Sequence, residues 1–172
     1  MNDSHAHRNA QLIRLEGLSK SYRTTEVETL ALDSVDIAIA RGEFVAVMGP
    51  SGCGKSTLLN IIGMLDSPTS GAYHFLEENI AGYPERKLAN IRKHHVGFIF
   101  QSFNLIDELN VFENVELALL YHKIPARERR RRVETVMDKV GIAHRAKHMP
   151  GQLSGGQQQR VAVARALVAE PE

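Results

Sequence analysis

A glycine-rich segment between an apolar run and an amphipathic stretch constrains the fold of this chain more than any other feature. The apolar run is Phe44-Val45-Ala46-Val47-Met48, and the segment that follows it is Gly49-Pro50-Ser51-Gly52-Cys53-Gly54-Lys55-Ser56. The next apolar residues recur at helical spacing: Leu58, Leu59, Ile62 and Leu65. A continuous apolar run is typical of a strand that is covered on both faces of a parallel sheet. A strand, a glycine-rich loop and a helix in this order predict an α/β fold.

The glycine-rich segment fits the pattern G-x-x-x-x-G-K-[ST], in which a loop binds the phosphates of a nucleotide. Glycines let successive backbone N–H groups turn toward a phosphate chain, and the helix that follows adds its positive dipole end. We expect Lys55 to reach the β- and γ-phosphates and the Ser56 hydroxyl to bind Mg²⁺. The residues expected to contact ATP are Gly49, Ser51, Gly52, Cys53, Gly54, Lys55, Ser56 and Thr57. The flanking strand and helix disfavour the alternative, a chance glycine-rich turn.

A second segment with adjacent glycines is Leu153-Ser154-Gly155-Gly156-Gln157-Gln158-Gln159-Arg160. Ser154 and Gln157 have the spacing of a helix capping box, so a helix is expected to begin here. Two glycines in the first turn of a helix cost roughly 1 kcal/mol each in helix propensity, which makes an ordinary capped helix the weaker interpretation. The Ser154 hydroxyl and the N–H groups of the two glycines instead predict a second phosphate-binding helix start.

The second segment resembles the signature motif of ATP-binding-cassette (ABC) ATPases, and the first resembles their Walker A motif. Tyr22, otherwise an ordinary core or surface tyrosine, is similar to the aromatic residue of this family that stacks on adenine. Gln101, after the strand-like Val96–Phe100, is similar to the Q-loop glutamine that touches Mg²⁺ and the attacking water. The resemblance implies catalytic roles for Lys55 and Gln101. It also implies contacts to ATP from Ser154, Gly155, Gly156 and Gln157.

The resemblance extends from about Leu12 to Glu172 and implies an incomplete ABC ATPase domain over residues 12–172. Its expected parts are an N-terminal antiparallel β portion, a P-loop core, and an inserted helical subdomain at about 104–160. Shorter strand candidates are Ala72–Leu76 and the Val96–Phe100 segment. Residues 1–11 are polar and are expected to form a disordered leader.

Apolar residues at helical spacing support the helical subdomain. They form three stripes: Phe112, Val115 and Leu119; Val133, Val136, Met137 and Val140; and, after the signature motif, Val161, Ala164, Leu167 and Val168. A basic run, Arg127 and Arg129–Arg132, lies opposite the second stripe. A solvated helix face is the better interpretation of that run than a lipid or nucleic-acid site.

Three further segments are most similar to one branch of the family: Gly63–Gly71, Gln101–Leu105 and Glu113–Leu117. That branch includes lipoprotein-releasing and macrolide- or peptide-exporting systems. The resemblance implies a cytoplasmic ATPase subunit on the inner face of the membrane, bound to a transmembrane permease. It further implies a homodimer, in which each ATP lies between the Walker A motif of one subunit and Ser154 and Gly156 of the other.

The composition of the chain is compatible with a protein partner and argues against nucleic acid as one. Lys and Arg number 21 against 20 Asp and Glu, so the net charge of +1 argues against a protein that binds nucleic acid. Apolar runs are too short for a membrane helix, and the single cysteine excludes an intrachain disulfide.

The family's next elements, the Walker B strand that ends in Asp-Glu, the D-loop and the switch histidine, have no counterpart in these 172 residues. We therefore expect a chain that binds ATP but does not hydrolyse it alone, with the edge of Phe44–Met48 exposed and the stripe of Val161, Ala164 and Val168 partly uncovered. For these residues themselves, the alternative to an ATPase part coupled to transport is a module that only binds nucleotide and never hydrolyses it. A soluble ABC-type ATPase of DNA repair or translation is the alternative for the family, although only 52 residues without sustained heptads separate Gln101 from Ser154.

Overall fold

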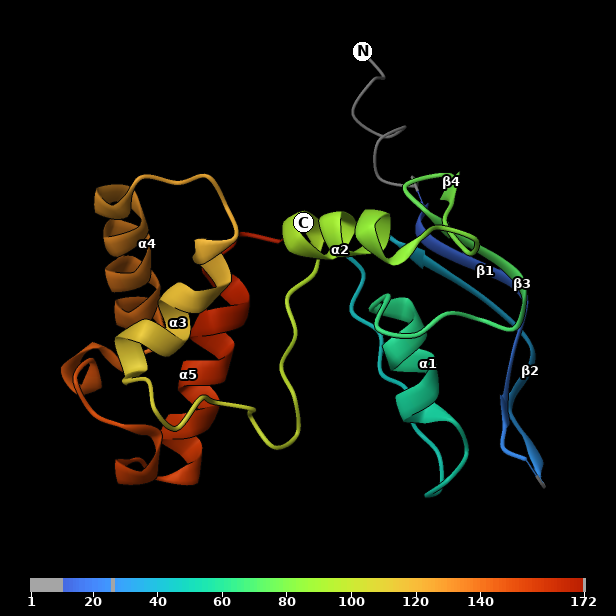
Figure 1. The fold of residues 1–172 in the computed structure, drawn as a ribbon, viewed down its shortest axis with the longest axis horizontal. Helices are drawn as coiled ribbons and strands as arrows, with labels where there is room; N and C mark the ends of the chain where they lie inside the picture. The colour runs from blue at the N-terminus through green and yellow to red at the C-terminus, as the bar shows by residue number, and fades with distance from the viewer. Residues whose placement is uncertain (1–10, 26, 172) are drawn as a thin grey trace, which may run out of the picture. The chain divides into compact units, whose positions relative to one another are not determined.

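The computed structural model describes residues 11–25 and 27–171, which leaves most of the expected leader outside the described residues. The chain forms two compact units, the first ending at Ala89 and the second beginning at Asn90. In the first unit the elements are β1 (Gln11–Arg23), β2 (Glu28–Ala40), α1 (Lys55–Ile62), β3 (Ser70–Phe75) and β4 (Glu78–Asn79). Helix α2 (Glu85–His95) contains the division (Figure 1). The second unit holds α3 (Val111–Leu120), α4 (Ala126–Lys139), the short 3-10 helices η2 (Ala143–Arg145) and η3 (Pro150–Gln152), and α5 (Gly155–Leu167).

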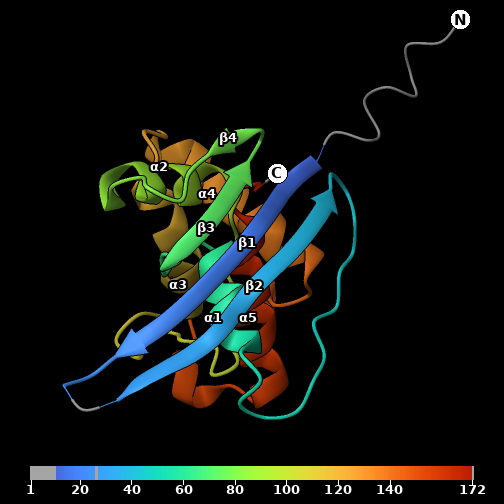
Figure 2. The ribbon, with the colours of Figure 1, turned by 90° about the vertical axis from the view of Figure 1, so that its right-hand side faces the viewer.

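An antiparallel sheet in the order β2-β1-β3-β4 forms the first unit, as predicted for the N-terminal β portion (Figure 2). The central strand β1 pairs Leu15 with Ile37 on one side and with Tyr73 on the other. Leu15 and Leu18 are buried, and the Tyr73 hydroxyl donates a hydrogen bond of 2.7 Å to the carbonyl of Ile62. This bond ties the C-terminal end of α1, the helix that follows the glycine-rich loop, to the sheet.

The buried face of α1 differs from the predicted one. Leu58 and Ile61 are buried at the spacing i, i+3, whereas Leu59 is 52% exposed and Leu65 is 45% exposed. The apolar residues of this segment fit two adjacent helical stripes, and packing against the sheet selects one of them.

The predicted buried strand at Phe44–Met48 is not formed, and neither is the one at Val96–Phe100. A strand needs a partner for its backbone N–H and C=O groups, and among the described residues neither segment has one. Phe44 is 96% exposed and Met48 is 88% exposed. The expectation of a strand covered on both faces is therefore wrong for these residues. Because no strand forms, there is no strand edge to expose either, although the segment itself is exposed.

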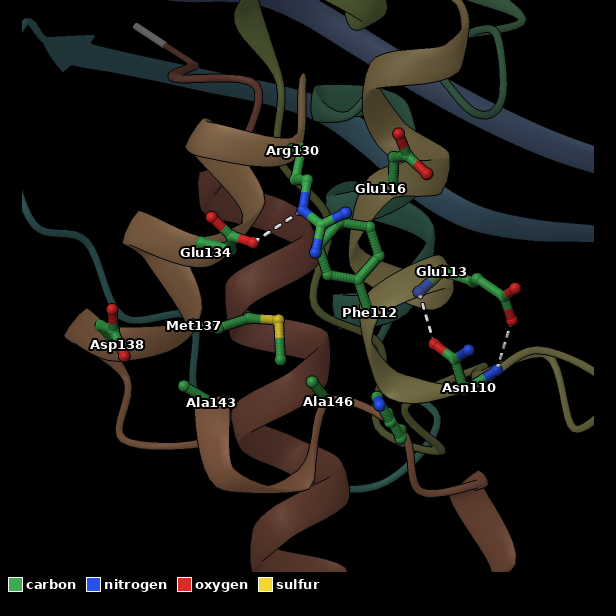
Figure 3. A pocket seen from close by; sticks show the side chains of 11 residues that line it. Asn110, Phe112, Glu113, Glu116, Arg130, Glu134, Met137, Asp138, Ala143 and Ala146 are labelled. Carbon is green, nitrogen blue, oxygen red and sulfur yellow. Dashed lines mark hydrogen bonds and ion pairs between the residues drawn. The ribbon is translucent and has the colours of Figure 1, made fainter. Parts of the chain in front are cut away.

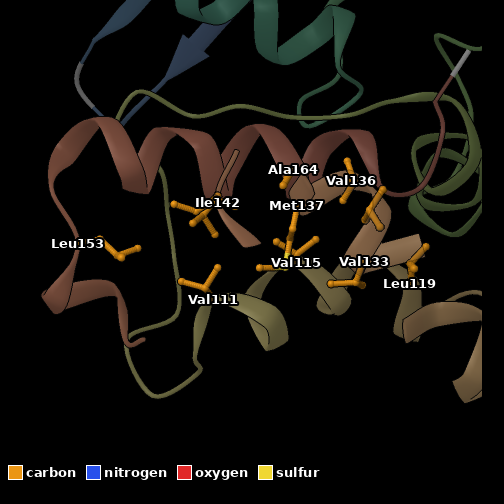
Figure 4. Close-up of a cluster of buried hydrophobic side chains, with 11 residues drawn as sticks. Val111, Val115, Leu119, Val133, Val136, Met137, Ile142, Leu153 and Ala164 are labelled. Atoms are coloured by element: carbon orange, nitrogen blue, oxygen red, sulfur yellow. The ribbon is translucent and has the colours of Figure 1, made fainter. Parts of the chain in front are cut away.

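Helices α3, α4 and α5 enclose the core of the second unit (Figure 4). Its buried members are Val111, Val115, Leu119, Val133, Val136, Met137, Ile142, Leu153, Val161, Ala164 and Val168. The expectation that Val161, Ala164 and Val168 would be partly uncovered is wrong, since their side chains are at most 3% exposed. Helices α3 and α4 supply the cover, so this unit closes its own core.

The basic run on α4 is a solvated helix face only in part: Arg130 and Arg131 are exposed, whereas Arg129 and Arg132 are half-buried. Carboxylates of the same unit neutralise the run. Arg129 pairs with Glu116 at 3.0 Å, Arg130 with Glu134 at 2.9 Å, and Arg131 with Glu128 at 2.7 Å. The hydrogen bonds from Arg131 and Arg132 lower the pKa of Glu128 to about 2. No helix among the described residues has both the length and the apolar content that crossing a membrane requires.

Candidate nucleotide-binding site

The glycine-rich loop leads into α1 through a left-handed residue. Gly54 is the N-cap of α1 with a φ of +88°, and a Cβ at this position would lie 2.5 Å from the carbonyl oxygen of Ala31. Only glycine fits both the conformation and the space. No side chain caps α1, whereas α3 and α5 each begin with a complete capping box. The first N–H groups of α1 are therefore available to an anion.

Lys55 places a positive charge inside this loop. Its Nζ donates hydrogen bonds to the carbonyls of Gly49, at 2.9 Å, and Pro50, at 2.6 Å, and lies 3.6 Å from Sγ of Cys53. The ammonium is thus enclosed by the backbone that would surround a phosphate chain. Ser51, Gly52, Cys53 and Ser56 are exposed, and Thr57 is half-buried.

These residues fit the phosphates of ATP with a divalent cation. Glycines line the loop, an uncapped helix start follows it, and a cation lies within it. The described residues contain no group of three or more His, Cys, Asp or Glu side chains that could hold a metal ion by itself. Mg²⁺ would therefore have to be held by phosphate oxygens together with single protein groups, for which the Ser56 hydroxyl is suited.

Tyr22, the predicted adenine-stacking residue, is held in place by two residues that the sequence interpretation missed. Its hydroxyl donates a 2.9 Å hydrogen bond to Asp66, and the Nζ of Lys20 lies 4.9 Å from its ring centroid. Lys20 also pairs with Asp66 at 2.6 Å. Burial acts to raise the pKa of Asp66, but the hydrogen bonds from Lys20 and Tyr22 outweigh it and hold the pKa below its usual value. Tyr22 remains 43% exposed, so part of its ring is available to a ligand.

The signature segment forms the predicted capping box at the start of α5. The Gln157 N–H donates to the Ser154 hydroxyl at 3.4 Å, and the Ser154 N–H donates to the Gln157 side chain at 3.0 Å. Ser154, Gly155 and Gly156 are exposed. A Cβ at either glycine would meet no atom within 4 Å, so the chain's own packing does not require glycine there.

Gln101 is exposed in a turn of the second unit, and α5 holds the backbone that follows it. Phe103 and Asn104 both have left-handed backbone, with φ of +60° and +48°. Arg165 donates hydrogen bonds of 2.6 Å to both of their carbonyls. Sequence patterns could not identify Arg165, because it contacts residues about sixty positions earlier in the chain.

The predicted residues thus fall into two groups, one in each unit. The first unit holds Tyr22 and residues 49–57, on β1 and at the start of α1. The second holds Gln101 and residues 154–157. Within it, helix α5 begins with the signature segment and also contacts the backbone just after Gln101.

A pocket of about 570 Å³ opens beside α3 and α4 in the second unit (Figure 3). Phe112, Met137 and two alanines form its apolar part. The full lining is Asn110, Phe112, Glu113, Glu116, Arg130, Glu134, Met137, Asp138, Ala143, Ala146 and Lys147. Four carboxylates against two basic groups give the pocket an acidic character.

Residues 32–172 match the protein family described as ABC transporter. An uncharacterised ABC transporter ATP-binding protein, YknY of Bacillus subtilis (strain 168), is 49% identical over 161 residues, which are 94% of this chain and 70% of that protein. The macrolide export ATP-binding/permease protein MacB of Azoarcus sp. (strain BH72) is 48% identical over 157 residues, which are 91% of this chain and 24% of that protein.

The same fold is present in a dimeric structure of the ATP-binding cassette MJ0796 in a post-hydrolysis state, bound to ADP and Pi. The TM-score is 0.85 at 44% identity, and the match covers 92% of this chain and 70% of that one. The family match, the identity to these relatives and the shared fold agree with the two glycine motifs. The chain therefore belongs to the ABC transporter family, and its fold is that of the ABC ATPase domain.

Proposed function

We propose that the chain is the ATP-binding part of a transporter, with the phosphates of ATP bound by residues 49–57 and the adenine stacked on Tyr22. One observation carries this proposal: the Lys55 ammonium lies inside a glycine loop at a helix start that no side chain caps. When bound, Mg²⁺ would neutralise charge on the β- and γ-phosphates, with Ser56 and Gln101 as its protein contacts. Lys55 would exchange its two carbonyl bonds for phosphate oxygens.

Thermal melting in the presence of Mg-ATP tests nucleotide binding. A ligand that binds only the folded state stabilises it by about 2.7 kcal/mol at a concentration of 100 Kd. We expect Mg-ATP to raise the melting temperature and AMP, which lacks the β- and γ-phosphates, to raise it far less. Equal melting curves with and without millimolar Mg-ATP would contradict the proposal.

The signature segment acts on ATP bound to a second subunit, in a head-to-tail homodimer. Support comes from Gly155 and Gly156, which are exposed and have open space where a Cβ would lie, so packing within the chain does not account for two glycines at a helix start. A dimer of MJ0796 bound to ADP and Pi is consistent with this arrangement. In the full-length protein, Ser154→Arg should abolish ATP turnover and leave nucleotide binding by the monomer unchanged. Unimpaired hydrolysis would argue against action in trans.

A membrane permease is the proposed partner, and export or lipoprotein or lipid release is the proposed transport. Relatives named as macrolide and pyoverdine export ATP-binding/permease proteins support export over a role in DNA repair or translation. This partner places the chain in the cytoplasm, at the inner face of the membrane. Cytoplasmic loops of membrane proteins carry an excess of Lys and Arg, and the acidic pocket beside α3 and α4 suits such a loop. Asp138→Lys should reduce co-purification with the permease, whereas Asp33→Lys, an exposed control in the other unit, should not.

Hydrolysis needs groups beyond those in residues 1–172. P-loop ATPases hold Mg²⁺ with a Walker B aspartate as well as the loop hydroxyl, and a general base contributes about 10²–10⁴-fold. The acidic pairs that follow apolar residues do not have the Walker B setting: Glu77-Glu78 lies where β3 turns into β4 of the antiparallel sheet, and Asp107-Glu108 follows Leu105-Ile106 in a segment that forms no strand. A polypeptide of these residues should therefore bind ATP with background turnover, and a chain extended through the next strand should hydrolyse it. Steady turnover by the 172 residues would show that another carboxylate serves as the base.

A further inference from the structure

The segment around Gln101 lies against α5 on both sides of the glutamine. After Gln101, the two Nη atoms of Arg165 each donate a 2.6 Å hydrogen bond, one to the carbonyl of Asn104 and one to that of Phe103. Before Gln101, a Cβ on Gly97 would lie 2.6 Å from the carbonyl oxygen of Ala166. Arg165 thus bonds the backbone that follows the glutamine, and its neighbour Ala166 lies so close to the backbone before it that only glycine fits there.

The backbone that Arg165 holds is one that residues with a side chain rarely adopt. Phe103 and Asn104 are both left-handed, and for a bulky residue such as phenylalanine this conformation is unfavourable. It turns two successive carbonyls toward one guanidinium, whose planar fork can bond both. Among the described residues, no ion pair includes Arg165, so no carboxylate competes for the fork.

We propose that Arg165 is a positioning residue of the ATPase: it fixes the Q-loop to α5, so that the place of Gln101 is set by the helix whose first turn carries Ser154. Arg165 follows Ser154 by eleven positions, which is about 16 Å along a helix. A displacement of the signature end of α5 would thereby move the Q-loop with it. The catalytic meaning of this link rests on the proposed function, whereas the link itself does not.

Amide hydrogen exchange tests the link without nucleotide. The N–H of Phe103 donates to the carbonyl of Phe100 at 3.0 Å, and that of Asn104 to Ser102 at 2.6 Å, so both amides report on the turn. In the full-length protein, Arg165→Gln should speed exchange at these two amides at least tenfold, which is about 1.4 kcal/mol. Arg165→Lys keeps the charge but not the fork, and it should give an intermediate rate.

Arg129→Gln is the matched control. Arg129 is also half-buried in this unit, and it donates to Glu116 and to the carbonyl of Ile124, each at 3.0 Å. Its loss should lower the melting temperature by a similar amount and leave exchange at Phe103 and Asn104 unchanged. If both variants speed exchange at these amides equally, Arg165 contributes only to the overall stability of the unit, and the proposal is overturned. An exchange rate in Arg165→Gln within twofold of the parent's would overturn it as well.

Kinetics of the full-length protein with its permease then test the catalytic meaning. Arg165→Gln should lower kcat for ATP at least tenfold while the Kd for nucleotide stays within twofold, because the Lys55 loop is untouched. A parent protein that fails to bind ATP would refute the proposed function and leave the exchange result standing. Faster exchange with unchanged kcat would overturn the positioning role.

Discussion

Asn114 offers a quantitative test of the second unit, because it is a polar residue buried completely among apolar ones. Its Oδ1 accepts a 2.8 Å hydrogen bond from the N–H of Ile106. Its Nδ2 donates to the carbonyls of Ile106, Leu109 and Asn110 at 2.8–3.0 Å. The side chain therefore holds the loop between the Q-loop and α3.

Asn114→Ala should leave two of these backbone groups without a partner. The carbonyls of Ile106 and Asn110 keep other hydrogen bonds, from the N–H groups of Leu109 and of residue 114 itself. The N–H of Ile106 and the carbonyl of Leu109 do not. Ile106 is 38% exposed and Leu109 is half-buried, so water can replace part of what is lost, and each hydrogen bond then contributes about 0.5–1.5 kcal/mol. The two bonds together predict a loss of roughly 1–3 kcal/mol of unfolding free energy, out of the 5–15 kcal/mol typical of a folded domain.

Urea unfolding followed by far-ultraviolet circular dichroism measures this loss. Asn60→Ala is the matched control, since Asn60 is an exposed helical asparagine and its replacement should change stability by less than about 0.5 kcal/mol. Asn114→Asp keeps the acceptor and loses all the donors, so it should destabilise at least as much as Asn114→Ala. A loss below about 1 kcal/mol for Asn114→Ala would refute the hydrogen-bond arrangement.

Three further predictions concern the first unit. Lys55→Ala removes a charged contact worth about 1.5–3 kcal/mol and should weaken Mg-ATP binding roughly 10- to 150-fold by titration; equal affinity would exclude Lys55 from the site. Cys53 is exposed in the loop, so bound Mg-ATP should slow its labelling by a maleimide, and an unchanged rate would contradict the placement of the phosphates. Asp66→Asn removes the carboxylate that holds Tyr22 and should lower stability at pH 7. Because the folded-state pKa of Asp66 lies below 3.8, this difference from the parent should be full above pH 3.8 and decrease as the pH falls through that lower pKa, and a difference that is independent of pH would exclude the ion pair as its cause.

Local sequence patterns predicted those parts of the molecule whose geometry is set within a few residues. The glycine loop before α1 and the capping box of Ser154 and Gln157 are of this kind, because both depend on neighbours along the chain. The helices after Asn110 also follow from helical spacing, whereas the antiparallel N-terminal sheet was implied by the family resemblance.

Parts that depend on distant partners could not be predicted in the same way. The apolar residues of α1 fit two stripes, and contact with the sheet decided for Leu58 and Ile61. The apolar run at Phe44–Met48 has the composition of a strand, but pairing also needs a second strand. Arg165 bonds carbonyls about sixty residues away, and a carbonyl leaves no mark in the sequence, because every residue has one.

Gly156→Ala tests whether glycine is required at this position for folding or for ATP turnover. The position is in the first turn of α5, and a Cβ there would meet nothing within 4 Å. Because alanine favours a helix over glycine by roughly 0.5–1 kcal/mol, the variant should be slightly more stable to urea than the parent. If Gly156 instead serves a nucleotide on a second subunit, the added methyl group should lower ATP turnover of the full-length protein without changing nucleotide affinity of the monomer. Gly82→Ala, at an exposed glycine with equally open space, is the control and should leave turnover unchanged. A Gly156→Ala protein with both higher stability and full turnover would mean that nothing approaches this helix start, and the proposal of a signature acting in trans would fail with it.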